Sequence, residues 1–123
     1  MLWYFHLVLM LIMSICDGAW IWLNMSSYSQ NIINIQNTET VAMRSVFALP
    51  IYIVMYMSVI MIAVPLYPTY DMGSGALVGF SVYSTYNLCL LLQFENSSVA
   101  LGVIDTIWGT LLFMCLTKLA VTF

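Results

Sequence analysis

Charged residues are scarce in this chain of 123 residues, where they make up only 6% of the sequence. A soluble domain carries about 25% charged residues, because its surface must face water. Two Lys and Arg residues and five Asp and Glu residues are too few to solvate a globule of 13.9 kDa. The chain is instead 63% hydrophobic, with a mean hydropathy of +1.01. This composition predicts an integral, multi-pass membrane protein whose outer surface contacts the lipid bilayer.

Several classes of function lack the residues that they need. Arg44 and Lys118 are the only Lys or Arg residues, so the chain has no basic patch for nucleic acid. The three cysteines, Cys16, Cys89 and Cys115, lie inside apolar stretches without paired spacing, so we expect neither a disulfide framework nor a metal site. The sequence also contains no Ser–His–Asp set, His-rich cluster or phosphate-binding glycine loop. We therefore expect no enzymatic activity and no cofactor.

Four apolar runs are each long enough to cross the bilayer. They cover roughly residues 2–23, 41–66, 73–94 and 99–121, and each would form a helix about 30 Å long or longer. No Lys or Arg precedes the first run, so we expect a membrane helix there and not a signal peptide. Short connections make neighbouring spans antiparallel. The prediction is an all-α fold, a single transmembrane domain built as a four-helix up-down-up-down bundle.

The connections between the spans define two faces of the predicted bundle. Both chain ends lie at face A, while the polar loop at residues 24–40 and the turn before the fourth span lie at face B. The sequence leaves open whether residues 24–40 form a short interfacial helix or an extended loop. Pro65 and Pro68 are predicted to end the second span. Ser97 or Ser98 is a candidate N-cap for the fourth span.

Two copies of an Asp-x-x-Trp pattern place acidic groups inside the membrane. Asp17-Gly18-Ala19-Trp20 lies near the end of the first span, and Asp105-Thr106-Ile107-Trp108 lies near the start of the fourth. Asp and Trp three residues apart share one face of a helix. Both carboxyl groups are then expected at a similar depth near face B, at the level that the end of the third span also reaches. The predicted intramembrane polar cluster comprises Asp17, Trp20, Tyr83, Tyr86, Asn87, Asp105 and Trp108.

Two interpretations of this cluster follow from its residues. In the first, Asp17 and Asp105 share a proton and form the site of a small proton-coupled transporter or channel subunit. In the second, the cluster is a hydrogen-bonded clamp that fixes the register of the helices. We favour the clamp, because polar contacts between membrane helices are common and no broken helix completes a transport path.

The third span also carries a pattern typical of close helix packing. Gly75 and Gly79 form a G-x-x-x-G step, which lets a second helix approach closely. The second helix belongs either to the same bundle or to a second copy of the chain. Packing within the bundle is the interpretation that we favour.

The sequence resembles a known family in its polar motifs. The stretches Gly79-Phe80-Ser81-Val82-Tyr83-Ser84-Thr85-Tyr86-Asn87-Leu88 and Val103-Ile104-Asp105-Thr106-Ile107-Trp108-Gly109-Thr110 are similar to the signature of the domain of unknown function 2177 family. The Asp-x-x-Trp pattern of the first span is similar too. The resemblance implies a small four-span membrane protein of a kind found in bacteria and some large DNA viruses. The chain departs from the family pattern at Asn87, where the family has Asp, and at Leu90, where it has Asn.

These departures remove a titratable carboxyl and a polar partner from the third span, and they shift our hypothesis toward a structural role. We expect a non-enzymatic structural or anchoring component of a larger membrane assembly. The resemblance to a family with viral members suggests the membrane layer of a large DNA virus particle. Expected partners are the lipid bilayer, neighbouring membrane or coat and capsid proteins, and a second copy of the chain.

Overall fold

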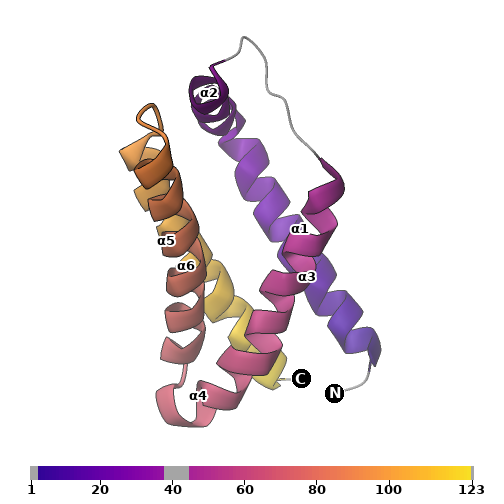
Figure 1. Ribbon diagram of the computed structural model, residues 1–123. Coiled ribbons are helices and arrows are strands. Elements are labelled where there is room, and N and C mark those ends of the chain that lie inside the picture. Colours follow the sequence, from indigo (N-terminus) through magenta and orange to yellow (C-terminus); the bar gives the residue numbers. More distant parts are fainter. Residues whose placement is uncertain (1–2, 38–44, 123) are drawn as a thin grey trace.

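The computed structural model describes residues 3–37 and 45–122 (Figure 1). Every regular element in these two ranges is helical. The elements are α1 (Trp3–Leu23), α2 (Met25–Gln36), the 3₁₀-helix η1 (Ser45–Phe47), α3 (Ala48–Ser58), the π-helix η2 (Val59–Ala63), α4 (Val64–Tyr70), α5 (Gly73–Gln93) and α6 (Val99–Thr122). The predicted loop at residues 38–40 and the predicted start of the second span at residues 41–44, Arg44 included, lie outside the described residues.

Four helical segments are long and apolar enough to cross a membrane. They are Trp3–Leu23, Ala48–Tyr70, Met72–Gln93 and Val99–Thr122. Between 17% and 33% of the most apolar window in each segment is buried inside the protein. Most residues of each segment are therefore not buried within the protein, as a lipid-facing helix requires. The prediction of an all-α integral membrane protein with four spans is confirmed.

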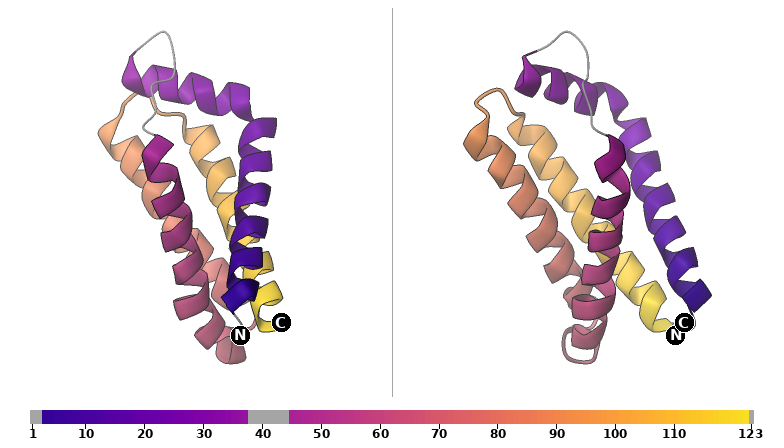
Figure 2. Two further views of the ribbon diagram at one scale, coloured as in Figure 1. Left: turned by 90° about the vertical axis from the view of Figure 1, so that its right-hand side faces the viewer. Right: turned by 45° about the vertical axis from the view of Figure 1, so that its right-hand side comes forward.

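The spans lie side by side, and α2 crosses one end of the bundle. Figure 2 places both ends of the chain together at one end, which is face A, and α2 together with the α5–α6 turn at the opposite end, face B. The described part of the predicted polar loop is thus mostly a helix, one of the two possibilities that the sequence left open. The helix ends at Gln36. The next residue, Asn37, is its C-cap: Asn37 has a left-handed φ of 55° and donates its N–H to Ile33 O.

The second span continues past both of its prolines, so the prediction that they end the helix was wrong. Pro65 and Pro68 lie inside the segment, which ends at Tyr70. Proline lacks the N–H group of a regular helical bond and crowds the preceding turn. A wider π turn at Val59–Ala63 comes immediately before, and Val64 N–H bonds there to the carbonyl five residues back. This local rearrangement lets the helix carry its prolines across the membrane.

The α5–α6 turn is capped and joined to α2. Ser98 Oγ accepts a hydrogen bond from Leu101 N–H at 3.2 Å, so Ser98 is the N-cap of α6. The N–H of Ser98 donates to Asn31 Oδ1 of α2 at 2.7 Å. These bonds hold α2 close to the turn at face B.

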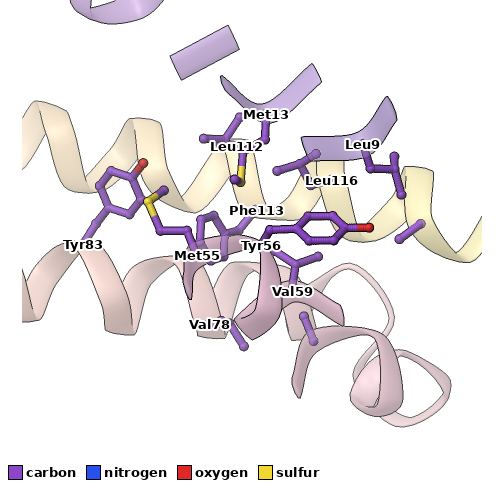
Figure 3. Packing of buried hydrophobic residues seen from close by; sticks show 12 residues of the cluster. Leu9, Met13, Met55, Tyr56, Val59, Val78, Tyr83, Leu112, Phe113 and Leu116 are labelled. Carbon is purple, nitrogen blue, oxygen red and sulfur yellow. The ribbon is translucent and has the colours of Figure 1, made fainter. Parts of the chain in front are cut away.

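The apolar core lies between the spans and is centred on α6. Phe113 of α6 is fully buried, and Figure 3 shows side chains of the other three spans around it. The buried apolar cluster includes Leu9 and Met13 of α1, Met55, Tyr56, Val59 and Ala63 of the second span, Val78 and Tyr83 of α5, and Leu112, Phe113, Leu116 and Ala120 of α6. Every span therefore contributes to a single core.

The glycine pattern of α5 faces α6 within the same bundle. A Cβ atom built at Gly75 would lie 2.6 Å from Phe113 O, and one built at Gly79 would lie 2.6 Å from Gly109 O. Carbonyl oxygens of a helix backbone cannot move aside as a flexible side chain can. The absence of a side chain at both positions thus sets how closely α5 and α6 approach each other.

Replacing Gly79 by Ala is expected to destabilise the protein. The added methyl must push α6 away or strain the backbone, which lowers the free energy of unfolding by about 1–3 kcal/mol. Gly18→Ala is the matched control, since nothing lies within 4 Å of a Cβ atom at Gly18. Unfolding by a denaturing detergent, followed by circular dichroism, measures both variants. Equal stability of the two variants would contradict the close contact of α5 with α6.

Candidate functional site

Two buried carboxyl groups lie at matching depth near face B. Asp17 of α1 is 7% exposed and Asp105 of α6 is 9% exposed. Asp17 lies six residues before the end of α1, and Asp105 lies six residues after the start of α6. At 1.5 Å per residue, each lies about 9 Å from the face B end of its helix. An acidic side chain inside the hydrocarbon core costs about 2.5–3.5 kcal/mol on insertion scales, so each needs partners.

Asp17 accepts hydrogen bonds from all three other spans. Its Oδ2 accepts from the Tyr52 hydroxyl of α3 at 2.6 Å. Its Oδ1 accepts from Trp108 Nε1 of α6 at 3.0 Å and from the Tyr83 hydroxyl of α5 at 3.3 Å. The two oxygens of a carboxyl group have room for several donors. The Asp17 side chain thus joins α1 to α3, α5 and α6.

Asp105 is bound by α5 and by the interfacial helix. The Tyr28 hydroxyl of α2 donates to Asp105 Oδ1 at 2.5 Å, and Asn87 Nδ2 of α5 donates to Asp105 Oδ2 at 2.9 Å. Asn87 Nδ2 also lies 2.8 Å from Tyr83 O and 3.3 Å from Thr106 Oγ1. Asp105 is therefore one of the points at which α2 is attached to the transmembrane bundle.

The two tryptophans join the partners of the two carboxyl groups. The Trp20 and Trp108 rings stack, with centroids 4.7 Å apart and planes 3° from parallel. Trp108 donates to Asp17 on the other helix, whereas Trp20 donates to the Tyr28 hydroxyl at 2.8 Å, which in turn donates to Asp105. Neither Trp therefore bonds to the Asp of its own motif. Trp108 bonds directly to Asp17, and Trp20 is linked to Asp105 through the Tyr28 hydroxyl.

These contacts form one network, which we call the face B network. It comprises Asp17, Trp20, Tyr28, Tyr52, Tyr83, Asn87, Asp105 and Trp108. No described hydrogen bond joins the two carboxyl groups directly; neutral donors surround both. In the described part of the chain, every buried side-chain nitrogen or oxygen atom has a hydrogen-bond partner. The network thus satisfies its polar groups internally, as a site without access to water requires.

The structure brings together six of the seven residues predicted from the sequence. Tyr86 is the exception, since it is 60% exposed and no described hydrogen bond connects it to the face B network. Sequence reasoning missed Tyr28 and Tyr52, which are both donors to carboxylates. A hydroxyl within the apolar stretch Ile51-Tyr52-Ile53 could have signalled the second of these, because a buried hydroxyl needs an acceptor.

Tyr28 lies on α2, outside the spans, and its environment favours the neutral phenol. Burial raises the pKa of the Tyr28 hydroxyl above its ordinary value of 10.0, and the hydrogen bond to Asp105 raises it further. Because the pKa of Tyr28 is higher in the folded than in the unfolded protein, its protonated hydroxyl stabilises the fold at any pH below its unfolded pKa. This stabilisation is lost as the pH rises through the pKa of Tyr28 in the folded protein. Tyr28 consequently remains a hydrogen-bond donor at neutral pH.

The described residues contain no group of three or more His, Cys, Asp or Glu side chains that could hold a metal ion. The only described Lys or Arg residue, Lys118, lies on α6 toward face A, where its Nζ donates to the Tyr67 hydroxyl at 3.1 Å. The carboxyl groups near face B are therefore held by hydrogen bonds alone within the described chain. Such an arrangement can fix helix positions, and it can exchange protons only if water reaches it.

Comparison with known proteins gives a family for nearly the whole chain. The family described as Predicted membrane protein (DUF2177) matches residues 2–122. No curated protein and no solved structure matches the chain.

Tyr52→Phe is expected to destabilise the bundle while leaving its apolar packing in place. The change removes the 2.6 Å donor to Asp17, and loss of a hydrogen bond between membrane helices lowers the free energy of unfolding by about 0.6–2 kcal/mol. Tyr86→Phe is the control, because Tyr86 lies outside the face B network. Denaturation in mild detergent measures both variants, and an unchanged Tyr52→Phe variant would show that this bond contributes nothing.

Proposed function

This chain belongs to the DUF2177 family of predicted membrane proteins, and from that premise we propose that it is a non-enzymatic structural or anchoring component of a larger membrane assembly. The observation that carries the proposal is the face B network. It connects α1, α3, α5 and α6 with α2 through hydrogen bonds to two carboxyl groups. Such a network gives a small bundle one fixed arrangement, which a structural component needs.

The hydrogen-bonding pattern favours a clamp over a transport site. Asp17 accepts from three donors, and Asp105 accepts from two. The five donors come from four helices, α2, α3, α5 and α6, so opening a path to either carboxyl group breaks several bonds at once. Polar residues that bond across membrane helices commonly act in this way, with each bond contributing about 0.6–2 kcal/mol.

Partners in the assembly would meet two kinds of surface. The first is the apolar outer face of the spans, where residues such as Leu11, Ile15 and Met61 are more than 60% exposed. This face suits lipid and the helices of neighbouring membrane proteins or of a second copy. The second is α2, where the uncharged polar residues Ser26 and Gln30 are exposed. Hydroxyl and amide groups there suit a coat or capsid protein lying against face B.

The setting that we propose for this assembly is the membrane layer of a large DNA virus particle. Its support is the resemblance to a family with viral members, together with the small share of the chain that lies outside the spans. A virion membrane protein of this kind would present α2 to the protein layer beside the membrane. Lateral contacts of the spans with neighbouring membrane proteins would keep it in place within the membrane.

A second function, from a different class, is that of a small proton-coupled transporter or channel subunit. The observation that favours it is the burial of Asp17 and Asp105 at the same depth near face B. Intramembrane carboxyl groups are frequent elements of proton relays. Transport would require water to enter beneath α2 and reach the carboxyl groups in turn.

Site-specific photo-cross-linking in the native membrane or particle tests the assembly. A photoreactive phenylalanine analogue at Ser26 or Gln30 of α2 is expected to join the chain to one abundant coat or scaffold protein, identified by mass spectrometry. The same analogue at exposed Thr69, near face A, is the control for non-specific capture. Equal capture of the same protein from both faces, or no capture of another protein from α2, would contradict an anchoring role at face B.

Asp17→Asn and Asp105→Asn separate the clamp from the transporter. The amide keeps the shape of the side chain and one acceptor oxygen, so a clamp loses about 1–2 kcal/mol of stability and stays folded. Assembly with the captured partner then persists in both variants. A proton flux through reconstituted wild-type protein that vanishes in both folded variants would contradict the structural role.

A further inference from the structure

A groove of about 480 Å³ lies between α5 and α6, on a side of the pair that faces away from the core. Its rim consists of well-exposed apolar side chains, among them Phe80, Leu88 and Ile107. Its floor consists of smaller and less exposed residues, namely Ser84, Asn87, Gly102, Thr106 and Thr110. The contrast in side-chain size between rim and floor produces the hollow.

The groove has the length and the depth of one leaflet of a bilayer. Along α5 it runs from Phe80 to Leu91, and along α6 from Leu111 to Gly102, which is about 14–16 Å at 1.5 Å per residue. One leaflet of a hydrocarbon core about 30 Å thick measures about 15 Å. The groove begins near face B, beside the α5–α6 turn, and ends near the middle of the spans.

The width of the groove suits a single hydrocarbon chain and not a helix. The free space of the groove over that length is smaller than the volume that an α-helix of the same length would fill. An α-helix with its side chains is about 10–12 Å across and needs a cross-section of roughly 80–110 Å². A second copy of the chain therefore cannot seat a helix in the groove without moving its walls.

The surface that lines the groove is almost entirely apolar. The hydroxyls of Thr106 and Thr110 each donate at 2.8 Å to a carbonyl oxygen of their own helix. The side-chain amide of Asn87 is directed to Asp105 and Tyr83 O. An occupant of this groove thus gains mainly apolar contact, which an acyl chain provides along its whole length.

We propose that the α5–α6 groove is a binding site for one acyl chain of a phospholipid in the leaflet at face B. The bound chain covers Asn87 and Gly102, and Asn87 Nδ2 lies 2.9 Å from Asp105 Oδ2. It thereby keeps the back of the face B network dry. This site is independent of the assembly proposed above, because it needs only the bilayer and the chain itself.

A phosphatidylcholine that carries a photoactivatable diazirine in its acyl chain tests the site. The full chain is placed in phosphatidylcholine nanodiscs, irradiated, and mapped by peptide mass spectrometry. Labelling is expected to be several-fold higher at Leu88, Val103 and Ile107 than at Leu11 and Ile15, which are exposed on α1.

A matched pair of variants on α5 separates site binding from general lipid contact. Ser84→Leu fills the floor of the groove, and labelling of the groove is expected to fall to the level seen on α1. Ser81→Leu makes the same change three residues away, at an exposed position outside the groove, and labelling is expected to stay at the wild-type level.

Three results would overturn the proposal. The first is wild-type labelling of the groove no higher than that of α1. The second is labelling that Ser84→Leu leaves unchanged while circular dichroism shows the variant folded. The third is a cross-link from a photoreactive group at Ile107 to a second copy of the chain, which would assign the groove to a protein contact.

Discussion

Hydrogen bonding to two buried carboxyl groups is the constraint around which this small bundle is arranged. Water is absent from the hydrocarbon core, so a polar group placed there must find its partners within the protein. Asp17 draws donors from α3, α5 and α6, while Asp105 draws donors from α2 and α5. Burial of apolar side chains by itself favours association of the helices only weakly, because lipid tails are as apolar as the side chains. Close packing at Gly75 and Gly79 brings α5 to α6, and the bonds to the carboxyl groups tie the four spans and α2 together.

The position of α2 follows from the same constraint. None of its residues is buried, so apolar packing cannot hold it strongly against the bundle. Its attachments are polar: Tyr28 to Asp105, Asn31 to the N–H of Ser98, and Asn96 to Asn34 O. The stacked pair of Trp20 and Trp108 lies beside the first of these bonds. A surface helix that would otherwise lie loosely in the headgroup layer is thus fixed above the network, with its outer side turned to possible partners.

The sequence predicts the spans well because the bilayer sets their length and composition. It also predicts the shared depth of Asp17 and Asp105, since depth follows from counting residues along antiparallel helices. It does not predict the partners, because these depend on helix rotation: Trp20 bonds to Tyr28 and not to Asp17, and Tyr86 is exposed whereas Tyr83 is buried and joins the network. The sequence also does not predict the π turn before Pro65. Proline favours an end to the helix, whereas the bilayer favours its continuation, and the local backbone geometry decides between them.

A double-mutant cycle between Asp17→Leu and Asp105→Leu tests the central claim most directly. The two carboxyl groups share no described hydrogen bond, so they act together only if the intervening Tyr, Trp and Asn side chains form one cooperative network. The free energy of unfolding in mild detergent is measured for the wild type, both single variants and the double variant. The account predicts that the loss in the double variant is smaller than the sum of the single losses by about 1 kcal/mol or more. Additive losses, within about 0.5 kcal/mol, would contradict a single network.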